Sequence, residues 1–348
     1  MQDQIIKNTY LMKTRFTTLI ILFATLLLPG CKEREAAFKT YDGFALGTTY
    51  SVTVKGTPEQ LENVQGIIDE VIGIANDTYS IYNENSLLSR INRNETTQLD
   101  PNLSYLLEVA GIASDLSGGK YDVTILPLKE AYGFQAGIPQ QEDPNIDSLL
   151  RHVGYGKISG TDGHIVKENP GVRIDLNSVA KGYTVDFISN VLYRHGFEDY
   201  LVDIGGETFC RGSNPKGEDW KIGIETPVEG NYIKGNSIER IISVSGKGMA
   251  TSGNYRNFHT DSRGRKYTHI INPLTGENTE SNLLSATVVA ESCAVADALA
   301  TMFVAMGLED SEKLMKAHPE FAVLLIYADG DGEMKTVWSN AMSPYVVP

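Results

Sequence analysis

The stretch Glu291–Gly307, with the sequence E-S-C-A-V-A-D-A-L-A-T-M-F-V-A-M-G, consists almost entirely of apolar and small residues. Such a composition predicts a helix that is buried on all sides. The preceding run, Leu283–Ala290, is predicted to form a strand that enters this helix. We therefore expect the rest of the chain to pack around Glu291–Gly307.

Two polar residues interrupt the predicted helix, Asp297 and Thr301. Because they are four positions apart, both project from one face of the helix. A carboxylate inside an apolar helix is costly unless something pairs it, and a carboxylate with a hydroxyl suits Mg²⁺. In the alternative interpretation, Thr301 bonds back to its own helix and Asp297 meets a buried lysine or backbone amides. Spacing alone leaves both interpretations open.

Length and composition describe a soluble globular protein. The chain has 348 residues, of which 41% are hydrophobic and 21% charged, enough for one large domain or two smaller ones. The formal net charge is −14, which argues against a nucleic-acid partner and against electrostatic binding to anionic lipid.

The N-terminus has the pattern of a bacterial lipoprotein signal. Lys13 and Arg15 precede the apolar run Leu19–Leu28, and Pro29-Gly30-Cys31 follows. The run is too short to span a membrane as a helix. We therefore expect a signal peptide at residues 1–30, with Met12 as an alternative start.

Cys31 would then be lipidated, residues 31–40 would form a tether, and residues 41–348 would form the functional domain. This predicts a membrane-anchored lipoprotein of the bacterial cell envelope that faces the periplasm. An ordinary secretory signal with a chance cysteine is the alternative. The other cysteines, Cys210 and Cys293, could form a disulfide or stay unpaired in the core.

The expected elements mix strands and helices without strict alternation, which favours an α+β fold. Strands are predicted at 46–54, 171–176, 201–204, 240–245 and 283–290, and in a hairpin around 329–332. Helices are predicted at 61–75, 101–117 and 179–195, with Asn177-Ser178 as the N-cap pair of the last one. A loop is predicted at 246–256.

Three further stretches could carry chemistry. D-L-N-S-V-A-K at Asp175–Lys181 places a carboxylate, a hydroxyl and an ammonium around a helix N-terminus, where backbone N–H groups bind phosphate. The glycines of Gly246–Arg256 would let backbone approach a ligand closely. H-I-I-N-P-L-T-G at His269–Gly276 places a histidine where it could act as a general base. The structural alternatives are a capped helix with a surface lysine, a plain surface loop and a core histidine.

A different enzyme class shares two short motifs with this chain. Ser178–Lys181 matches S-x-x-K and Ser252–Asn254 matches S-x-N, as in penicillin-recognising serine enzymes. The third motif of that class, K-T-G, is absent, since only Leu274-Thr275-Gly276 occurs. That interpretation also leaves Asp297 and Thr301 unexplained.

Taken together, the chain from about Ala45 to Gly307 resembles the FAD:protein FMN transferase family, the ApbE-type flavin transferases. The motifs that carry the resemblance are D-L-N-S-V-A-K-G-Y at Asp175, V-D-I-G-G-E at Val202, A-T-S-G-N-Y-R at Ala250, H-I-I-N-P-L-T-G at His269 and A-D-A-L-A-T at Ala296. The resemblance implies mixed, largely antiparallel sheets flanked by helices, with an FAD site in a cleft between lobes.

The resemblance also implies an activity: transfer of FMN from FAD to a threonine or serine hydroxyl of a membrane redox subunit, with Mg²⁺ holding the pyrophosphate and AMP leaving. The roles that it implies are metal binding by Ser178, the Ala180 carbonyl, Asp297 and Thr301; FAD binding by Leu46, Tyr82, Lys120, Tyr121, Asp122, Asp175, Lys181 and Ile271; and proton removal by His269.

Several positions depart from the commoner family pattern. Leu46 stands where methionine is frequent, Lys120-Tyr121 replaces a smaller pair, and Asn254 and Asn272 stand where aspartate is usual. The two asparagines put a carboxylate role at those positions in doubt. Two other functions fit nearly the same residues: hydrolysis of FAD to FMN and AMP, and flavin binding without catalysis.

Overall fold

An eight-stranded sheet organises the domain, with its strands in the order β1-β2-β5-β6-β9-β12-β13-β14. The computed structural model describes residues 35–135, 138, 140–141, 144–227, 237–254, 258–260, 266–268, 270–278 and 281–348, and Phe38–Pro348 form one compact unit. The strands of the sheet are Ala37–Ala45 (β1), Thr48–Gly56 (β2), Tyr200–Ile204 (β5), Glu207–Arg211 (β6), Lys247–Gly253 (β9), Leu283–Ala290 (β12), Ala322–Ala328 (β13) and Met334–Trp338 (β14). The neighbours from β2 to β14 pair antiparallel.

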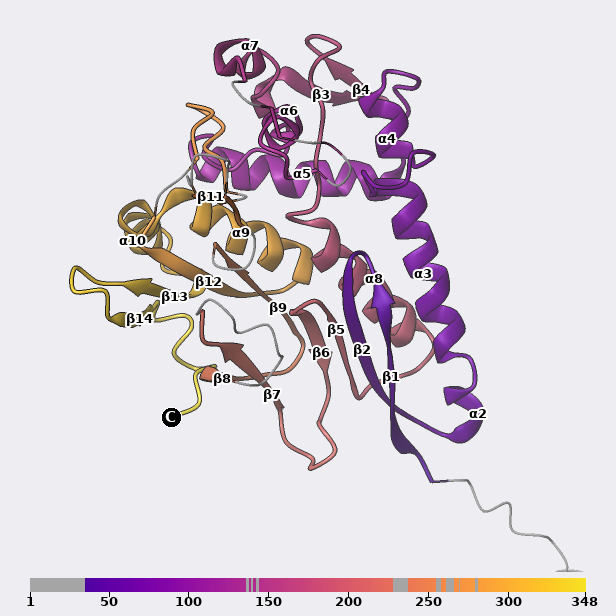
Figure 1. Cartoon of the computed structure of the whole chain (residues 1–348). Helices are drawn as coiled ribbons and strands as arrows, with labels where there is room; N and C mark the ends of the chain where they lie inside the picture. Colours follow the sequence, from indigo (N-terminus) through magenta and orange to yellow (C-terminus); the bar gives the residue numbers. More distant parts are fainter. Residues whose placement is uncertain are drawn as a thin grey trace, which may run out of the picture. The chain divides into compact units, whose positions relative to one another are not determined.

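Helices cover one face of this sheet (Figure 1). Cys293–Met306 (α9) packs on β9 and β12, and Ala180–Arg194 (α8) packs on β5, β6 and α9. The other helices are Pro58–Leu61 (α2), Val64–Tyr79 (α3), Leu87–Asn92 (α4), Pro101–Leu116 (α5), Leu126–Ala131 (α6), Ile146–Leu150 (α7) and Leu308–Ala317 (α10), with a 3₁₀ turn at Tyr155–Lys157 (η1). The predicted α+β class is therefore confirmed.

Within the described residues, three two-stranded sheets lie outside the main sheet. They pair Ile158–Thr161 (β3) with His164–Lys167 (β4), Trp220–Glu225 (β7) with Ile238–Val244 (β8), and Phe258–Thr260 (β10) with Lys266–Thr268 (β11). The strand predicted at 240–245 is thus present as β8, but it belongs to one of these small sheets.

The predicted central helix and its entering strand are confirmed. β12 spans Leu283–Ala290 and α9 spans Cys293–Met306. Ser292 caps α9, since its side chain accepts a hydrogen bond from the Val295 N–H. The ten residues of α9 that are buried include Asp297, so the helix is enclosed as its composition predicts.

Most of the other predicted elements are also present, namely the helices at 61–75, 101–117 and 179–195, the strands at 46–54 and 201–204, and the hairpin around 329–332. β1 begins at Ala37, inside the stretch predicted as a tether. Cys210 and Cys293 are free, buried thiols.

Three local predictions are wrong. The stretch 171–176 forms no strand; Arg173 only makes an isolated parallel bridge to Ile125. The predicted N-cap at Asn177-Ser178 is replaced by Val179, which has no side-chain cap bond. The predicted loop at 246–256 contains β9, a strand in the middle of the sheet.

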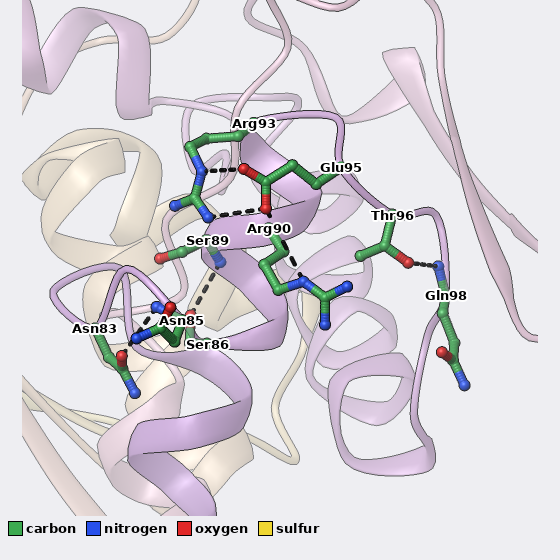
Figure 2. A network of polar contacts seen from close by, with 9 residues as sticks. All are labelled: Asn83, Asn85, Ser86, Ser89, Arg90, Arg93, Glu95, Thr96 and Gln98. Carbon is green, nitrogen blue, oxygen red and sulfur yellow. Dashed lines mark hydrogen bonds and ion pairs between the residues drawn. The ribbon is translucent and has the colours of Figure 1, made fainter.

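The connection from α3 to α4 is held by side-chain caps (Figure 2). The Asn83 side chain accepts from the Asn85 N–H at 3.0 Å, and Ser86 Oγ accepts from the Ser89 N–H at 3.0 Å. At the far end of α4, the Arg93 guanidinium donates to both oxygens of Glu95, at 2.7 and 3.0 Å. The caps at Asn83 and Ser86 fix the loop that carries Tyr82.

In the part of the chain that is described, no helix has the length and apolar character needed to cross a membrane.

Candidate active site

A close contact between α8 and α9 places Asp297. The Gly182 N–H of α8 donates to Asp297 Oδ2 at 3.0 Å. A Cβ on Gly182 would lie 2.3 Å from the Cys293 carbonyl oxygen and 2.8 Å from the Asp297 Cβ. Glycine is therefore required at this point for the two helices to approach, and the approach brings the N-terminus of α8 to the carboxylate.

Asp297 is a buried carboxylate next to a lysine. Only 2% of the residue is exposed. Burial raises the pKa of Asp297 to about 7, although the Lys181 ammonium and the Gly182 N–H act in the opposite direction. These contacts agree in part with the alternative interpretation from the sequence, in which Asp297 meets a buried lysine or backbone amides. The Gly182 N–H is such an amide, whereas the Lys181 side chain is 29% exposed and pairs with Glu207. These contacts do not exclude a metal, because a carboxylate whose charge is costly gains from a nearby cation.

Lys181 forms an ion pair with Glu207, the first residue of β6. Burial acts to lower the pKa of Lys181, but the Asp297 and Glu207 carboxylates raise it more, so the side chain is held charged. Glu207 Oε2 is buried and has no hydrogen-bond partner among the described residues. Glu207 closes the motif V-D-I-G-G-E and was not predicted as a site residue; that motif was the signal that could have identified it.

Two pairs of hydroxyl groups involve the candidate metal-binding residues Thr301 and Ser178. Thr301 Oγ1 and Ser252 Oγ lie 2.8 Å apart, which ties α9 to β9. The Ser178 and Tyr121 hydroxyls also lie 2.8 Å apart. Burial raises the pKa of Tyr121, and Asp297 is the first of the carboxylates that add to this shift, so the Tyr121 hydroxyl lies within electrostatic range of Asp297.

Asp175 lies deep in the same region, paired with a residue that the sequence did not single out. Its carboxylate forms an ion pair with Lys129 of α6, and its Oδ1 accepts from the Asn177 N–H at 2.9 Å. The Asn177 side chain donates to the Tyr82 hydroxyl at 3.2 Å. Tyr82 is 59% exposed, so its ring is available to a planar ligand.

Other predicted FAD-binding residues have mainly structural contacts. Asp122 accepts from the Thr124 and Tyr155 N–H groups, and Lys120 pairs with Asp310 of α10. Ile271 is buried against Leu128, Tyr132 and Val153. Leu46 has a φ of 52° in the turn between β1 and β2. These contacts leave their predicted roles in FAD binding untested, and His269 and Cys31 lie outside the described residues.

The residues suit a hard cation only together with a ligand that supplies more oxygens. Among the described residues there is no group of three or more His, Cys, Asp or Glu side chains that could hold a metal. Asp297 would be the charged protein ligand, with the Thr301 and Ser178 hydroxyls and the Ala180 carbonyl as neutral ones. Mg²⁺ commonly binds one or two carboxylates plus substrate phosphates, which fits this set.

The two serines of the S-x-x-K and S-x-N motifs do not pair with the lysine. Ser178 contacts Tyr121, Ser252 contacts Thr301, and Lys181 contacts Glu207. A serine nucleophile activated by Lys181 would need that contact. The motif match to penicillin-recognising enzymes is therefore not supported by the described geometry.

Comparison with known proteins identifies the family. The model of the ApbE family matches residues 46–325. The chain belongs to the ApbE family. A relative from Vibrio cholerae serotype O1 named "FAD:protein FMN transferase" is 33% identical over 94% of this chain and 98% of its own length. A relative of the same name from Escherichia coli K12 is 28% identical over 97% of this chain and 99% of its own.

Solved structures of the ApbE family share the fold. The flavin transferase ApbE from Vibrio cholerae matches with a TM-score of 0.77 and 30% identity, covering 89% of this chain and 99% of that one. The ApbE protein from Thermotoga maritima matches with a TM-score of 0.78 and 25% identity, over 90% and 100%. The family resemblance read from the five motifs is therefore confirmed.

The pKa of Asp297 predicts how the metal-free protein responds to pH. Its ordinary pKa is 3.8 and its folded pKa is about 7, so between these values the folded chain binds more protons than the unfolded chain. The free energy of unfolding should therefore fall as pH rises from 4 to 7. Asp297→Asn removes this contribution. Chemical denaturation in EDTA should show that the free energy of unfolding of the variant increases relative to that of the wild type as pH rises. The relative increase should reach on the order of 2–4 kcal/mol at pH 8. A difference that is constant from pH 5 to pH 8 would contradict the assignment.

Proposed function

We propose that this protein transfers FMN from FAD to a threonine or serine hydroxyl of a membrane redox subunit, with Mg²⁺ and release of AMP. The observation that carries the proposal is the buried Asp297 carboxylate, which accepts from the Gly182 N–H near the N-terminus of α8 and lies four residues before Thr301 on α9. The names of the ApbE relatives support the reaction class.

In this proposal the residues that would hold Mg²⁺ for the pyrophosphate of FAD are Asp297, Thr301, Ser178 and, through its carbonyl, Ala180. The ion, when bound, neutralises the pyrophosphate and the leaving phosphate. Lys181, held charged and paired with Glu207, would contribute positive charge at the same phosphates. Tyr82 and Asp175 hold the cofactor's rings, together with the remaining predicted FAD-binding residues.

The chemical step forms one P–O bond and breaks another. The acceptor hydroxyl oxygen attacks the phosphorus of the FMN phosphate, and the bond to the bridging oxygen of the pyrophosphate breaks with its electron pair, so AMP leaves. The proton of the hydroxyl passes to His269, which acts as the general base. The product is a phosphodiester between FMN and the acceptor side chain.

The decisive experiment is incubation of the chain from Phe38 onward with FAD, Mg²⁺ and candidate membrane redox subunits. Flavin fluorescence in a denaturing gel should appear in one acceptor and should disappear when its threonine or serine is replaced. Release of FMN and AMP without labelling of any acceptor would favour the hydrolase alternative. Flavin binding without either product would favour the non-catalytic alternative.

We also propose that Cys31 anchors the protein to the membrane of the cell envelope, facing the periplasm. The motif Pro29-Gly30-Cys31 after a short apolar run supports this proposal. Cys31→Ser should abolish labelling by a radioactive fatty acid and release the protein from the membrane fraction, or leave it as uncleaved precursor. Cys210→Ser is the control, because Cys210 is a buried thiol of the domain. Undiminished lipid labelling of Cys31→Ser would rule the anchor out.

A further inference from the structure

The ion pair between Lys129 and Asp175 joins a residue assigned to FAD binding, Asp175, to one that is not, Lys129. Side-chain exposure is 17% for Lys129 and 2% for Asp175, so the pair is largely withdrawn from water. Burial acts to lower the pKa of Lys129, but Asp175 raises it more, and Tyr82 adds to the rise. Lys129 is therefore a charged group that lies near both Asp175 and Tyr82.

The ammonium has more donors than the described contacts use. A lysine ammonium carries three N–H donors, and Asp175 is the one side-chain partner described for Lys129. Asp175 likewise has acceptor capacity beyond the Asn177 N–H and Lys129. The two groups satisfy each other in part, and the remaining N–H donors of Lys129 and lone pairs of Asp175 can meet a polar ligand.

An exposed aromatic ring stands beside this donor–acceptor pair. Tyr82 is exposed, and the Asn177 side chain ties its hydroxyl to the segment that follows Asp175. The capped loop before α4 holds the backbone at Tyr82 in place, since the Tyr82 N–H donates to Ser80 Oγ at 3.1 Å and Ser86 Oγ donates to the Ser80 carbonyl at 2.6 Å. A planar ring could stack on Tyr82 while its polar edge meets Lys129 and Asp175.

We infer that Lys129 is a further FAD-binding residue, which donates a hydrogen bond to a ring heteroatom of the cofactor while Asp175 accepts one from the same ring edge. The inference rests on the proposed function, because it takes FAD as the ligand. Lys129 and Asp175 together would recognise a nitrogen heterocycle that carries a hydrogen-bond donor and an acceptor on neighbouring atoms. FAD offers two such rings, the isoalloxazine and the adenine.

The test is to measure the equilibrium affinity of Lys129→Met for FAD, with flavin fluorescence as the readout and no acceptor protein present. A lost charge-assisted hydrogen bond should weaken FAD binding by about 10- to 100-fold. Arg173→Gln is the matched control. It removes a neighbouring ion pair between the same two segments, Arg173 with Glu130, whose described contact is 2.8 Å. FAD affinity in the control should stay within about threefold of the wild type.

Two fragments distinguish the two rings. If Lys129 meets the isoalloxazine, Lys129→Met should weaken FMN binding and leave AMP binding unchanged; if it meets the adenine, the reverse holds. Unchanged affinity for FAD, FMN and AMP in a folded Lys129→Met would overturn the inference. If Lys129→Met does not fold, the same affinities are measured on Lys129→Gln, which removes the charge but can still donate a hydrogen bond to Asp175.

A double-mutant cycle separates a direct contact from support of Asp175. If Lys129 acts only by holding Asp175, then Lys129→Met should cause no further loss of FAD affinity in an Asp175→Asn background. A further loss is the result expected for a direct contact, and its absence would overturn the inference. Because the readout is binding, a wild type that binds FAD but labels no acceptor would refute only the proposed transfer.

Discussion

Asp297→Ala is expected to abolish Mg²⁺-dependent turnover while the domain stays folded. Asp297 is the charged member of the proposed metal-binding set, and the remaining ligands are two hydroxyls and a carbonyl. These neutral groups cannot offset the cost of removing water from Mg²⁺. Folding should not suffer, because the substitution removes a buried charge whose pKa is raised to about 7 by burial. Transfer is measured by flavin labelling over a range of Mg²⁺ concentrations, and folding by thermal denaturation.

Asp186→Asn is the control for this prediction. Asp186 is a second buried carboxylate against α9, and its two oxygens each accept at 2.8 Å, from the Cys293 and Ala294 N–H groups. Its loss should reduce stability by about 0.5–2 kcal/mol, as for other helix caps, and leave the Mg²⁺ dependence intact. Full activity of Asp297→Ala, or wild-type activity in excess EDTA, would reject the metal assignment.

Much of the fold follows from local pattern, and the failures have a common cause. The helix at α9 was predictable because its apolar composition is continuous over several turns. The strand β9 was not, because its glycines suggested a loop. Gly248 is needed there for a tertiary reason: a Cβ would lie 2.3 Å from the Cys293 backbone nitrogen. A glycine in a central strand marks close approach of another backbone, and single-sequence patterns do not separate this case from a loop.

The candidate site likewise contains residues that local spacing predicts and partners that only the tertiary fold brings together. The spacing of Asp297 and Thr301 was sufficient to place them on one face, since helix periodicity is local. Their partners come from distant segments: Glu207 from β6 pairs with Lys181, and Lys129 from α6 pairs with Asp175. Lys129 lies on a helix of only six residues and in none of the motifs, so its role depends on the tertiary fold.

The proposed general base, His269, is expected to control the rate of transfer and not the binding of FAD. An acceptor hydroxyl is a poor nucleophile while it keeps its proton, and a histidine titrates near the working pH. His269→Ala should lower turnover by about 10²- to 10⁴-fold, the usual range for a lost general base. FAD affinity should hardly change, because the metal site, Asp175 and Tyr82 hold the cofactor in this proposal. The pH profile of turnover at saturating Mg²⁺ should lose its acidic limb.

Two measurements on the same variant separate rate from binding. Quenching of flavin fluorescence gives FAD affinity, and flavin labelling of the acceptor gives turnover. His164→Ala is the control, since His164 is an exposed histidine of the β3–β4 hairpin that contacts Thr97 at 3.0 Å. Normal transfer by His269→Ala would make that histidine structural and would require a carboxylate to take the proton. Loss of FAD binding would place His269 in the cofactor pocket, and the general-base role would then lose its support.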